Sequence, residues 1–442
     1  MREGLHAAFT AVDITPDQER ASSNGTKKER NYPVYDPLKA RILLLQDGEQ
    51  TAAVVAVDGF ELGIGFDEKV ADALFARGIK PFPTLFCPSH IGSTPISNYG
   101  AYIMIFAQDL IIENYEDEIS VRIADGIQDA FEMLVPVRIA SRGGHAPDVC
   151  YNRRFIKPDG TVHMVFNRQE SPPEPEWIEQ GKDDEVSVLR FDDLDGEAIG
   201  AFINFGCHAL CSTDKYGGIS ADYPRYVADV FGEVAGLPIV FAQGGLGDVV
   251  PIEREGLAAR RVGRSVGAQA LYVFEQIKPD STPSMETHTR EVEIPARRIP
   301  EEPEELRFNF TRMHDRYHRF LFEWYEQNPT IHYPIKVVTL GDTALVHMPG
   351  ELFHDTALAI KEASPFRHTV VISRPTREVA YVPTPEAFDQ GGMEPNLAAI
   401  APSSEPLIRQ AAIDLLAGLR GQWRSRAAKS SPRRRLQTCA TG

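Results

Sequence analysis

The sequence predicts an α/β fold: a single large domain in which a mixed sheet is flanked by helices. Along the first half of the chain, short β-branched runs alternate with amphipathic segments of helical period, which is the pattern of an α/β architecture. The chain has 442 residues, of which 43% are apolar and 25% charged, so it can bury a sizeable core. Disorder is therefore excluded as the main state.

The first predicted elements are two strands at 40–45 and 51–58, joined by Asp47-Gly48, a hairpin signal. A helix follows at 66–77, and Gly78 suits the C′ position just beyond its end. The next buried run, at 84–87, precedes an amphipathic helix at 111–134.

The second half continues the alternation after a Pro-rich acidic loop at 171–185. Strands are predicted at 186–191, 198–205, 290–294, 335–340, 343–348 and 369–373, and helices at 223–235, 258–276 and 304–327. The turn-rich segment 278–303 is a candidate division between two lobes of a domain spanning residues 1–419. Residues 420–442 are basic and rich in Ser and Ala, which predicts a disordered tail.

Charge and cysteine usage narrow the class of protein. A net charge of −17 repels phosphate backbones and anionic lipids, so we expect a small-molecule substrate and no nucleic-acid partner. No segment approaches the roughly 18 apolar residues of a membrane span, and residues 1–6 lack the apolar run of a secretory leader. Five cysteines, an odd number, form no disulfide framework, which favours a reducing compartment, the cytoplasm.

Four metal-capable side chains follow predicted strands: His90, His208, Glu351 and Tyr381. Ligands in α/β proteins bind beyond the carboxyl ends of strands, and histidines with one carboxylate are a usual catalytic zinc set. The alternative for each histidine alone is a hydrogen-bonded residue of the core or rim.

Seven segments occur in the order seen in neutral/alkaline non-lysosomal ceramidases, and the chain resembles that family up to about residue 402. They are Phe9-Thr-Ala-Val-Asp-Ile-Thr-Pro16, Asp36-Pro-Leu-Lys-Ala-Arg, Ser89-His90-Ile-Gly-Ser-Thr-Pro95, Asn204-Phe-Gly-Cys-His208, Gly247-Asp-Val-Val-Pro251, Pro349-Gly-Glu351 and Tyr381-Val-Pro-Thr-Pro-Glu386. The resemblance implies the catalytic fold of that family, without the C-terminal immunoglobulin-like domain of its larger members.

The resemblance also implies one zinc ion held by His90, His208, Glu351 and Tyr381. Such a set would accept manganese, iron or nickel as well. Of the remaining motif positions, Ser93 and Arg153 match and are candidates for substrate binding, and Ser220-Ala-Asp222 is similar to a Ser-Gly-Asp segment of the family.

Three positions depart from the family's pattern. Its second histidine is Gly92 here, its hydrolytic serine is Val250, and its second tyrosine is Met393. The metal ligands are kept while the ceramide-cleaving residues are not. We therefore expect a zinc-dependent hydrolase of a small, polar amide, ester or lactone rather than a ceramidase.

Two other functions stay open from the sequence: a metal-dependent lyase or isomerase acting on a sugar or hydroxy acid, and a non-enzymatic scaffold. For hydrolysis, the candidate general bases are Asp248, Asp222 and Glu378, each of which could instead cap a turn or form a salt bridge. Arg153, or its neighbour Arg154, could bind a carboxylate or phosphate in a bidentate fork.

Several other signals favour structural roles. The glycine-rich segment 243–248 lacks the spacing of a dinucleotide fingerprint, and His314 and His318 lack the glutamate of a His-Glu-x-x-His motif. An aromatic run at 317–325 has helical spacing and suits a core or a subunit interface, so a homo-oligomer also stays open.

Overall fold

The computed structural model describes residues 4–17, 33–63, 65–95, 112, 114–212, 218–298, 323, 325–376 and 379–430, the last nine of them by backbone alone. His314, His318, Glu378 and most of the helix predicted at 304–327 lie outside these ranges, as does the tail from 431.

The larger sheet has eight strands in the order β12-β11-β10-β5-β1-β2-β3-β4. Neighbouring strands are antiparallel through the middle of the sheet, while the outer pairs β11 with β12 and β3 with β4 are parallel. The strands are β1 (Leu5–Asp13), β2 (Lys39–Asp47), β3 (Gln50–Val57), β4 (Thr84–Pro88), β5 (Val135–His145), β10 (Glu185–Asp193), β11 (Ala198–Phe205) and β12 (Ile239–Gln243).

A second sheet has four strands in the order β14-β15-β16-β18. Its strands are β14 (Met285–Pro295), β15 (Thr330–Leu340), β16 (Thr343–Pro349) and β18 (His368–Arg374), of which β16 and β18 are parallel. The chain enters this sheet after α6, within the segment predicted to divide two lobes.

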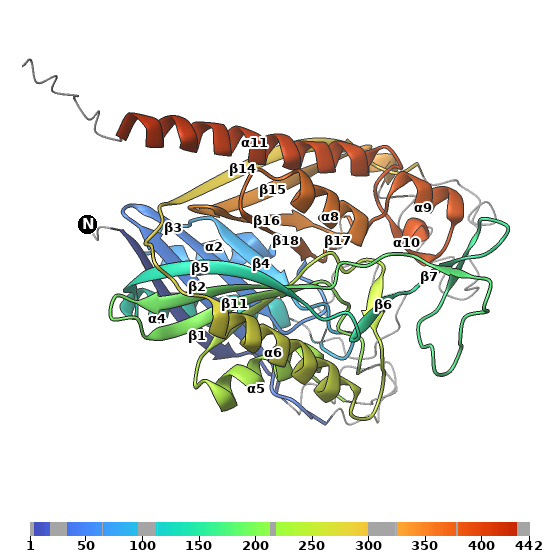
Figure 1. Cartoon of the computed structure of the whole chain (residues 1–442), viewed down its shortest axis with the longest axis horizontal. Helices are drawn as coiled ribbons and strands as arrows, with labels where there is room; N and C mark the ends of the chain where they lie inside the picture. The colour runs from blue at the N-terminus through green and yellow to red at the C-terminus, as the bar shows by residue number, and fades with distance from the viewer. Residues whose placement is uncertain are drawn as a thin grey trace, which may run out of the picture.

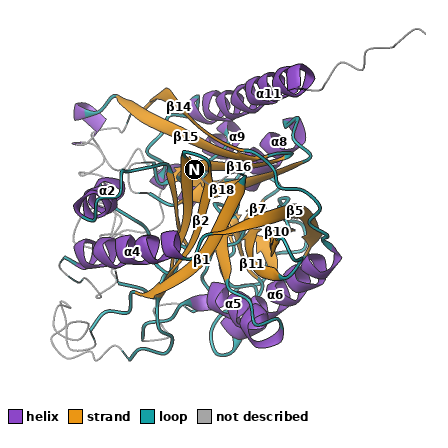
Figure 2. Ribbon diagram, turned by 90° about the vertical axis from the view of Figure 1, so that its left-hand side faces the viewer, coloured by secondary structure: helices purple, strands orange, loops and turns teal. Residues whose placement is uncertain are grey.

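The two sheets pack face to face, with helices on both outer faces (Figures 1 and 2). One apolar cluster joins Leu43, Phe202 and Val240 of the larger sheet to Leu345 and Ile372 of the smaller one. Outside the larger sheet lie α2 (Phe66–Ala76), α4 (Tyr115–Glu132), α5 (Asp222–Val234) and α6 (Ala258–Gln276). Outside the smaller sheet lie α8 (His354–Ala363) and α11 (Ser404–Ser430).

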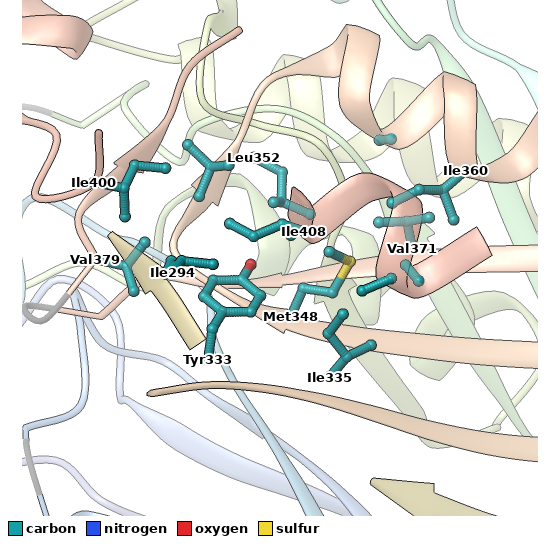
Figure 3. Packing of buried hydrophobic residues seen from close by; sticks show 14 of the residues in the cluster. Ile294, Tyr333, Ile335, Met348, Leu352, Ile360, Val371, Val379, Ile400 and Ile408 are labelled. Atoms are coloured by element: carbon teal, nitrogen blue, oxygen red, sulfur yellow. The ribbon is translucent and has the colours of Figure 1, made fainter. Parts of the chain in front are cut away.

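Figure 3 shows the packing on the outer face of the smaller sheet, where Tyr333, Ile335 and Val371 meet Ile360 of α8 and Ile408 of α11. These apolar side chains alternate along the strands, as expected for a sheet that buries this face under helices.

Short elements gather beyond the carboxyl ends of β11, β16 and β18. They are β6 (Cys150–Asn152) paired with β13 (Val249–Pro251), β17 (Glu351–Leu352) paired with β19 (Tyr381–Val382), the small sheet of β7 (Arg154–Ile156), β8 (Val162–Met164) and β9 (Ile178–Glu179), and the helices α9 (Pro385–Gln390) and α10 (Met393–Leu397).

The α/β class and the mixed sheet flanked by helices are confirmed, and no immunoglobulin-like domain is present among the described residues. The predicted hairpin at Asp47-Gly48 joins β2 to β3, and Gly78 has the positive φ, 76°, expected after α2. One finding differs from the prediction: the strands form two stacked sheets. The backbone of α11 continues to Ser430, and the disordered tail stays a prediction.

Two further findings concern the cysteines and the helices. Cys87, Cys150, Cys207 and Cys211 are free and buried. Among the described helices, none combines the length and the apolar character needed to span a membrane.

Candidate metal centre

Three of the predicted ligands converge at the carboxyl ends of the strands. His90 follows β4, His208 follows β11, and Glu351 opens β17 just after β16, so both sheets contribute. Their ligand atoms all lie within 4.8 Å of one another, and all three side chains are buried. The prediction that these residues form one cluster is confirmed.

Hydrogen bonds orient both imidazole rings toward the carboxylate. His90 Nδ1 lies 2.9 Å from the carbonyl oxygen of Phe60, and His208 Nδ1 lies 3.0 Å from that of Val249. The Nε2 atoms of His90 and His208 lie 3.3 and 2.9 Å from Oε2 of Glu351. A neutral ring whose Nδ1 donates its proton to a backbone carbonyl can bind a metal ion through Nε2, as in many metal sites.

The electrostatics of the cluster favour a cation. Burial lowers the pKa of His208 to about 4, assisted by the positive charge of Arg153, so this ring is neutral at neutral pH. Burial alone would raise the pKa of Glu351, but His90 and His208 outweigh it and hold the carboxyl ionised. Burial lowers the pKa of His90, and the Glu351 carboxylate more than offsets this, so the pKa is raised.

The donor chemistry fits a transition metal. Two imidazole nitrogens and one carboxylate oxygen, close together and shielded from water, are the usual protein ligands of a catalytic zinc site. These residues would hold the ion, and the backbone carbonyls of Phe60 and Val249 would fix the ring orientations.

Tyr381 lies beside Glu351 because β17 and β19 pair in parallel with these two residues in register. Its ring stacks on that of His208, with centroids 6.4 Å apart. The Tyr381 hydroxyl oxygen accepts a hydrogen bond of 3.1 Å from Arg153 Nη2, and burial raises the pKa of this phenol well above its ordinary value. The fourth-ligand role of Tyr381 stays a prediction.

Arg153 is held on several sides. Its Nε lies 2.7 Å from Oε1 of Glu394, and its Nη2 also donates to the carbonyl oxygen of Gly247 at 2.7 Å. Arg154 donates to the other oxygen of Glu394, again at 2.7 Å. The two arginines predicted as substrate ligands therefore share one buried carboxylate, and Arg153 also orients the Tyr381 hydroxyl.

Asp248 forms a buried pair with His354, which sequence reasoning missed. Its Oδ2 accepts from His354 Nδ1 at 2.6 Å and from Asn152 Nδ2 at 2.7 Å, and its Oδ1 accepts from the His354 backbone N–H. Burial lowers the pKa of His354, but Asp248 outweighs it and raises this pKa to about 10.

Asp222 and Ser93 lie together in a second buried network. Both oxygens of Asp222 accept backbone N–H groups, from Ser212 and Tyr223, each at 2.6 Å. Ser93 Oγ donates to the carbonyl of Ser220 at 3.4 Å. Burial raises the pKa of Asp222 to about 6, despite those backbone donors. Catalytic roles for Asp248 and Asp222, and substrate binding by Ser93, stay predictions.

Residues with unusual backbone conformations gather at the site. His90 has φ of 57°, and Ala380, directly before Tyr381, has φ of 55°. Asp222, in the second network, has φ of 48°. Gly350, directly before Glu351, has φ of 88°. Such left-handed conformations are costly for residues with a Cβ and concentrate at functional sites.

Two positions that depart from the family pattern have defined surroundings. Val250 packs in a small apolar cluster with Tyr151, Phe155 and Val165. Met393 opens α10, next to the Glu394 that binds both arginines.

Sequence reasoning also missed Gln243, at the end of β12. Its Nε2 donates to the carbonyl of Ser89 at 2.9 Å, while its Oε1 accepts the hydroxyl of Tyr223 at 3.1 Å and the backbone N–H of Cys207 at 3.4 Å. It thereby ties the segment before His90 to the segment before His208. A polar residue closing an otherwise apolar strand was the signal for it.

The fold and the cluster define an α/β protein with a buried site of the kind that holds a catalytic metal. Two solved structures share the fold. The crystal structure of neutral ceramidase from Pseudomonas aeruginosa has a TM-score of 0.72 and 18% sequence identity over 96% of this chain and 75% of its own. A structure of ceramidase complexed with C2 has a TM-score of 0.70 and 16% sequence identity over 95% of this chain and 76% of its own. The chain therefore has a ceramidase-like fold.

No protein-family model matches the sequence, and no curated protein matches it.

Proposed function

We propose that this protein is a metal-dependent hydrolase of a small, polar amide, ester or lactone, with zinc as its metal. The observation that carries the proposal is the convergence of two oriented imidazoles on one ionised, buried carboxylate. The ceramidase-like fold supports it, because the structures that share this fold are those of hydrolases.

When bound, a zinc ion would polarise a carbonyl group and lower the pKa of a water molecule to about 7. The chain's own residues would supply the rest. His90, His208 and Glu351 hold the cation, and Arg153 fixes the hydroxyl of Tyr381 toward the same region. Asp222 and Asp248, both buried carboxylates, are the candidate proton acceptors of this proposal.

Ceramide itself is not the substrate in this proposal. The position where the related family carries its hydrolytic serine holds Val250, whose side chain packs among Tyr151, Phe155 and Val165. A valine can neither attack a carbonyl nor transfer a proton, so cleavage must depend on water. We place the enzyme in a reducing compartment, the cytoplasm, because its four described cysteines are free.

Elemental analysis of the purified protein tests the proposal, with wild type and His208→Ala measured in parallel. We expect about one zinc per chain in wild type and loss of that zinc in the variant, because the site then keeps only one of its two imidazole ligands. His332→Ala, which removes an exposed imidazole of β15, is the matched control and should keep its zinc.

A wild-type protein that binds neither zinc nor manganese after incubation would contradict the metal site. If zinc is bound but no amide, ester or lactone is cleaved, the hydrolase proposal fails while the metal site stands.

A further inference from the structure

A cleft of about 540 Å³ lies between the first turns of α8 and α11 and the short helix α9. These helices lie together at one end of the smaller sheet (Figure 1). Arg154 of β7 and Gln180, which follows β9, complete the lining, whereas His90, His208 and Glu351 do not line the cleft. Small-molecule sites have volumes of about 300 to 1,000 Å³, so a small ligand fits this space.

Buried polar groups form the inner part of the cleft. His354 Nδ1 lies 2.6 Å from Asp248 Oδ2, and the hydroxyl of Thr356 donates to Oε1 of Glu405 at 2.8 Å. All four of these side chains are buried, whereas that of Asp355 is 64% exposed. The cleft therefore leads from solvent to a buried polar floor. Ionisable residues that gather in such a cleft are typical of ligand-binding sites.

The cations of the cleft have acidic partners. His354 is protonated at neutral pH, because Asp248 outweighs burial in setting its pKa. Its ring lies between two carboxylates, since Nδ1 contacts Asp248 and Nε2 lies 3.1 Å from Oδ1 of Asp355. Arg409 Nε lies 2.8 Å from Oε1 of Glu405.

The remaining charges of the cleft are balanced in the same way. Arg154 Nη1 lies 2.7 Å from Oε2 of the buried Glu394. Glu405 and, to a smaller extent, Glu386 raise the pKa of Arg409, so Glu386 is a second acid near this cation. A charged ligand would compete with these partners, and a buried charge that loses its partner is strongly destabilising. The pairing therefore favours a ligand without net charge.

The side chains of the lining suit a ligand that carries hydroxyl groups. Carboxylates only accept hydrogen bonds and guanidinium groups only donate them, whereas the amides of Gln180 and Gln390 do both. A hydroxyl group also donates and accepts, so a ligand with several hydroxyls can bond to all of these groups without bringing a charge. Phe353, Pro385 and Pro406 add apolar surface for its C–H groups.

We propose that this cleft binds a small, neutral, polyhydroxylated compound, namely a sugar or a cyclic polyol. The inference goes beyond the proposed hydrolase function and does not depend on it, because His90, His208 and Glu351 are not part of the lining.

A ligand-observed NMR titration of the purified protein tests the inference, with D-glucose, D-galactose, D-mannose and myo-inositol as neutral probes. D-Glucosamine and D-glucuronate are the matched charged probes, because each differs from glucose by one cationic or one anionic group. We expect saturable binding of at least one neutral probe, and weaker binding of both charged probes than of that neutral one.

Two pairs of variants in α8 test whether the probe binds in this cleft. Ala359→Phe fills the cleft and should abolish binding, whereas Ala363→Phe makes the same change one turn further along, at an exposed position outside the lining, and should bind as wild type does. Asp355→Ala removes an acceptor and should weaken binding about 10-fold, because hydrogen bonds to charged groups are the stronger ones. Glu362→Ala removes an exposed acid outside the lining and should leave binding unchanged.

Circular dichroism establishes that each variant is folded, and Asp355→Ala decides the question if Ala359→Phe does not fold. The inference is overturned if no neutral probe binds to wild type, or if a charged probe binds more tightly than every neutral one. It is also overturned if Ala359→Phe and Asp355→Ala both bind as wild type does.

Zinc content and amide cleavage of the same preparations test the hydrolase proposal separately. A protein that binds a neutral probe in the cleft but neither holds zinc nor cleaves amides would overturn the hydrolase proposal and leave this inference standing. A zinc-containing protein that cleaves amides but binds no neutral probe would do the reverse.

Discussion

His354 and Asp248 show what a single buried contact contributes near the site. His354 Nδ1 lies 2.6 Å from Asp248 Oδ2, and both side chains are almost completely shielded from water. A buried carboxylate that loses its partner is strongly destabilising, because its charge is left uncompensated.

We predict that His354→Asn lowers the free energy of unfolding by about 3 kcal/mol at pH 6.5. Asp248 raises the pKa of His354 from 6.5 to about 10. The contribution of the charged His354 to the free energy of unfolding is therefore fully present below pH 6.5 and is lost as the pH rises through 10. The difference in the free energy of unfolding between wild type and His354→Asn should therefore become smaller toward pH 10. Urea unfolding at both pH values measures it.

The control for this prediction is His145→Asn. His145 forms a similar contact with Asp184, at 2.8 Å, but its side chain is 72% exposed, so we expect a change below about 1 kcal/mol. If His354→Asn lowers the free energy of unfolding equally at pH 6.5 and pH 10, the positive charge assigned to His354 in the folded protein is wrong.

For single residues, the sequence placed His90, His208 and Glu351 after short apolar strands, and the resemblance to a family then identified them as a ligand set. The sequence was not sufficient for His354 or Glu394, whose roles arise from contacts with residues distant in the chain. Glu394, for example, meets Arg153 across 241 residues, and no local pattern distinguishes it from a surface glutamate.

The pairing of β17 with β19 is the element that places Glu351 beside Tyr381. Gly350 leads into β17 with φ of 88°, and a Cβ there would lie 2.7 Å from Val379 Cγ1 and 3.0 Å from the carbonyl oxygen of Ala380. This turn therefore requires glycine both for its backbone conformation and for its close packing.

We predict that Gly350→Ala lowers the free energy of unfolding by about 3 kcal/mol and weakens zinc binding, since β17 must shift away from β19. Gly160→Ala is the matched control, because Gly160 has φ of 80° with no atom near the added Cβ, and it should cost only about 1 kcal/mol of backbone strain. Urea unfolding and zinc titration test both variants. Unchanged zinc affinity in Gly350→Ala would show that the turn does not position Glu351.

Most elements were predictable from local patterns, whereas these short pairs were not. The hairpin of β2 and β3 has a turn signal and alternating apolar residues. By contrast, β17 and β19 each contain two residues and pair across 30 positions, too short for any period to be recognised. The Pro-Gly-Glu and Tyr-Val-Pro segments were found through their resemblance to a family instead.

For the whole molecule, the arrangement of strands in two stacked sheets could not be predicted from the sequence. The strands of the two sheets have similar apolar patterns, so the sequence does not show to which sheet a strand belongs. The sheets are defined by the pairing of strands that are distant in the chain. The order of the sequence motifs was informative only because the fold brings the ends of β4, β11, β16 and β18 together.

Because the three ligands come from both sheets, a bound ion would link the two halves of the core. His90 and His208 follow strands of the larger sheet, and Glu351 follows β16 of the smaller one. An unfolded chain does not hold these residues together, so the ion stabilises the native state alone, by about 4 kcal/mol at a thousandfold excess over its Kd. We predict that a chelator lowers the Tm of the zinc-loaded protein by about 5 °C, measured by scanning calorimetry. His208→Ala should show no such shift, and an equal shift in this variant would place the stabilising ion elsewhere.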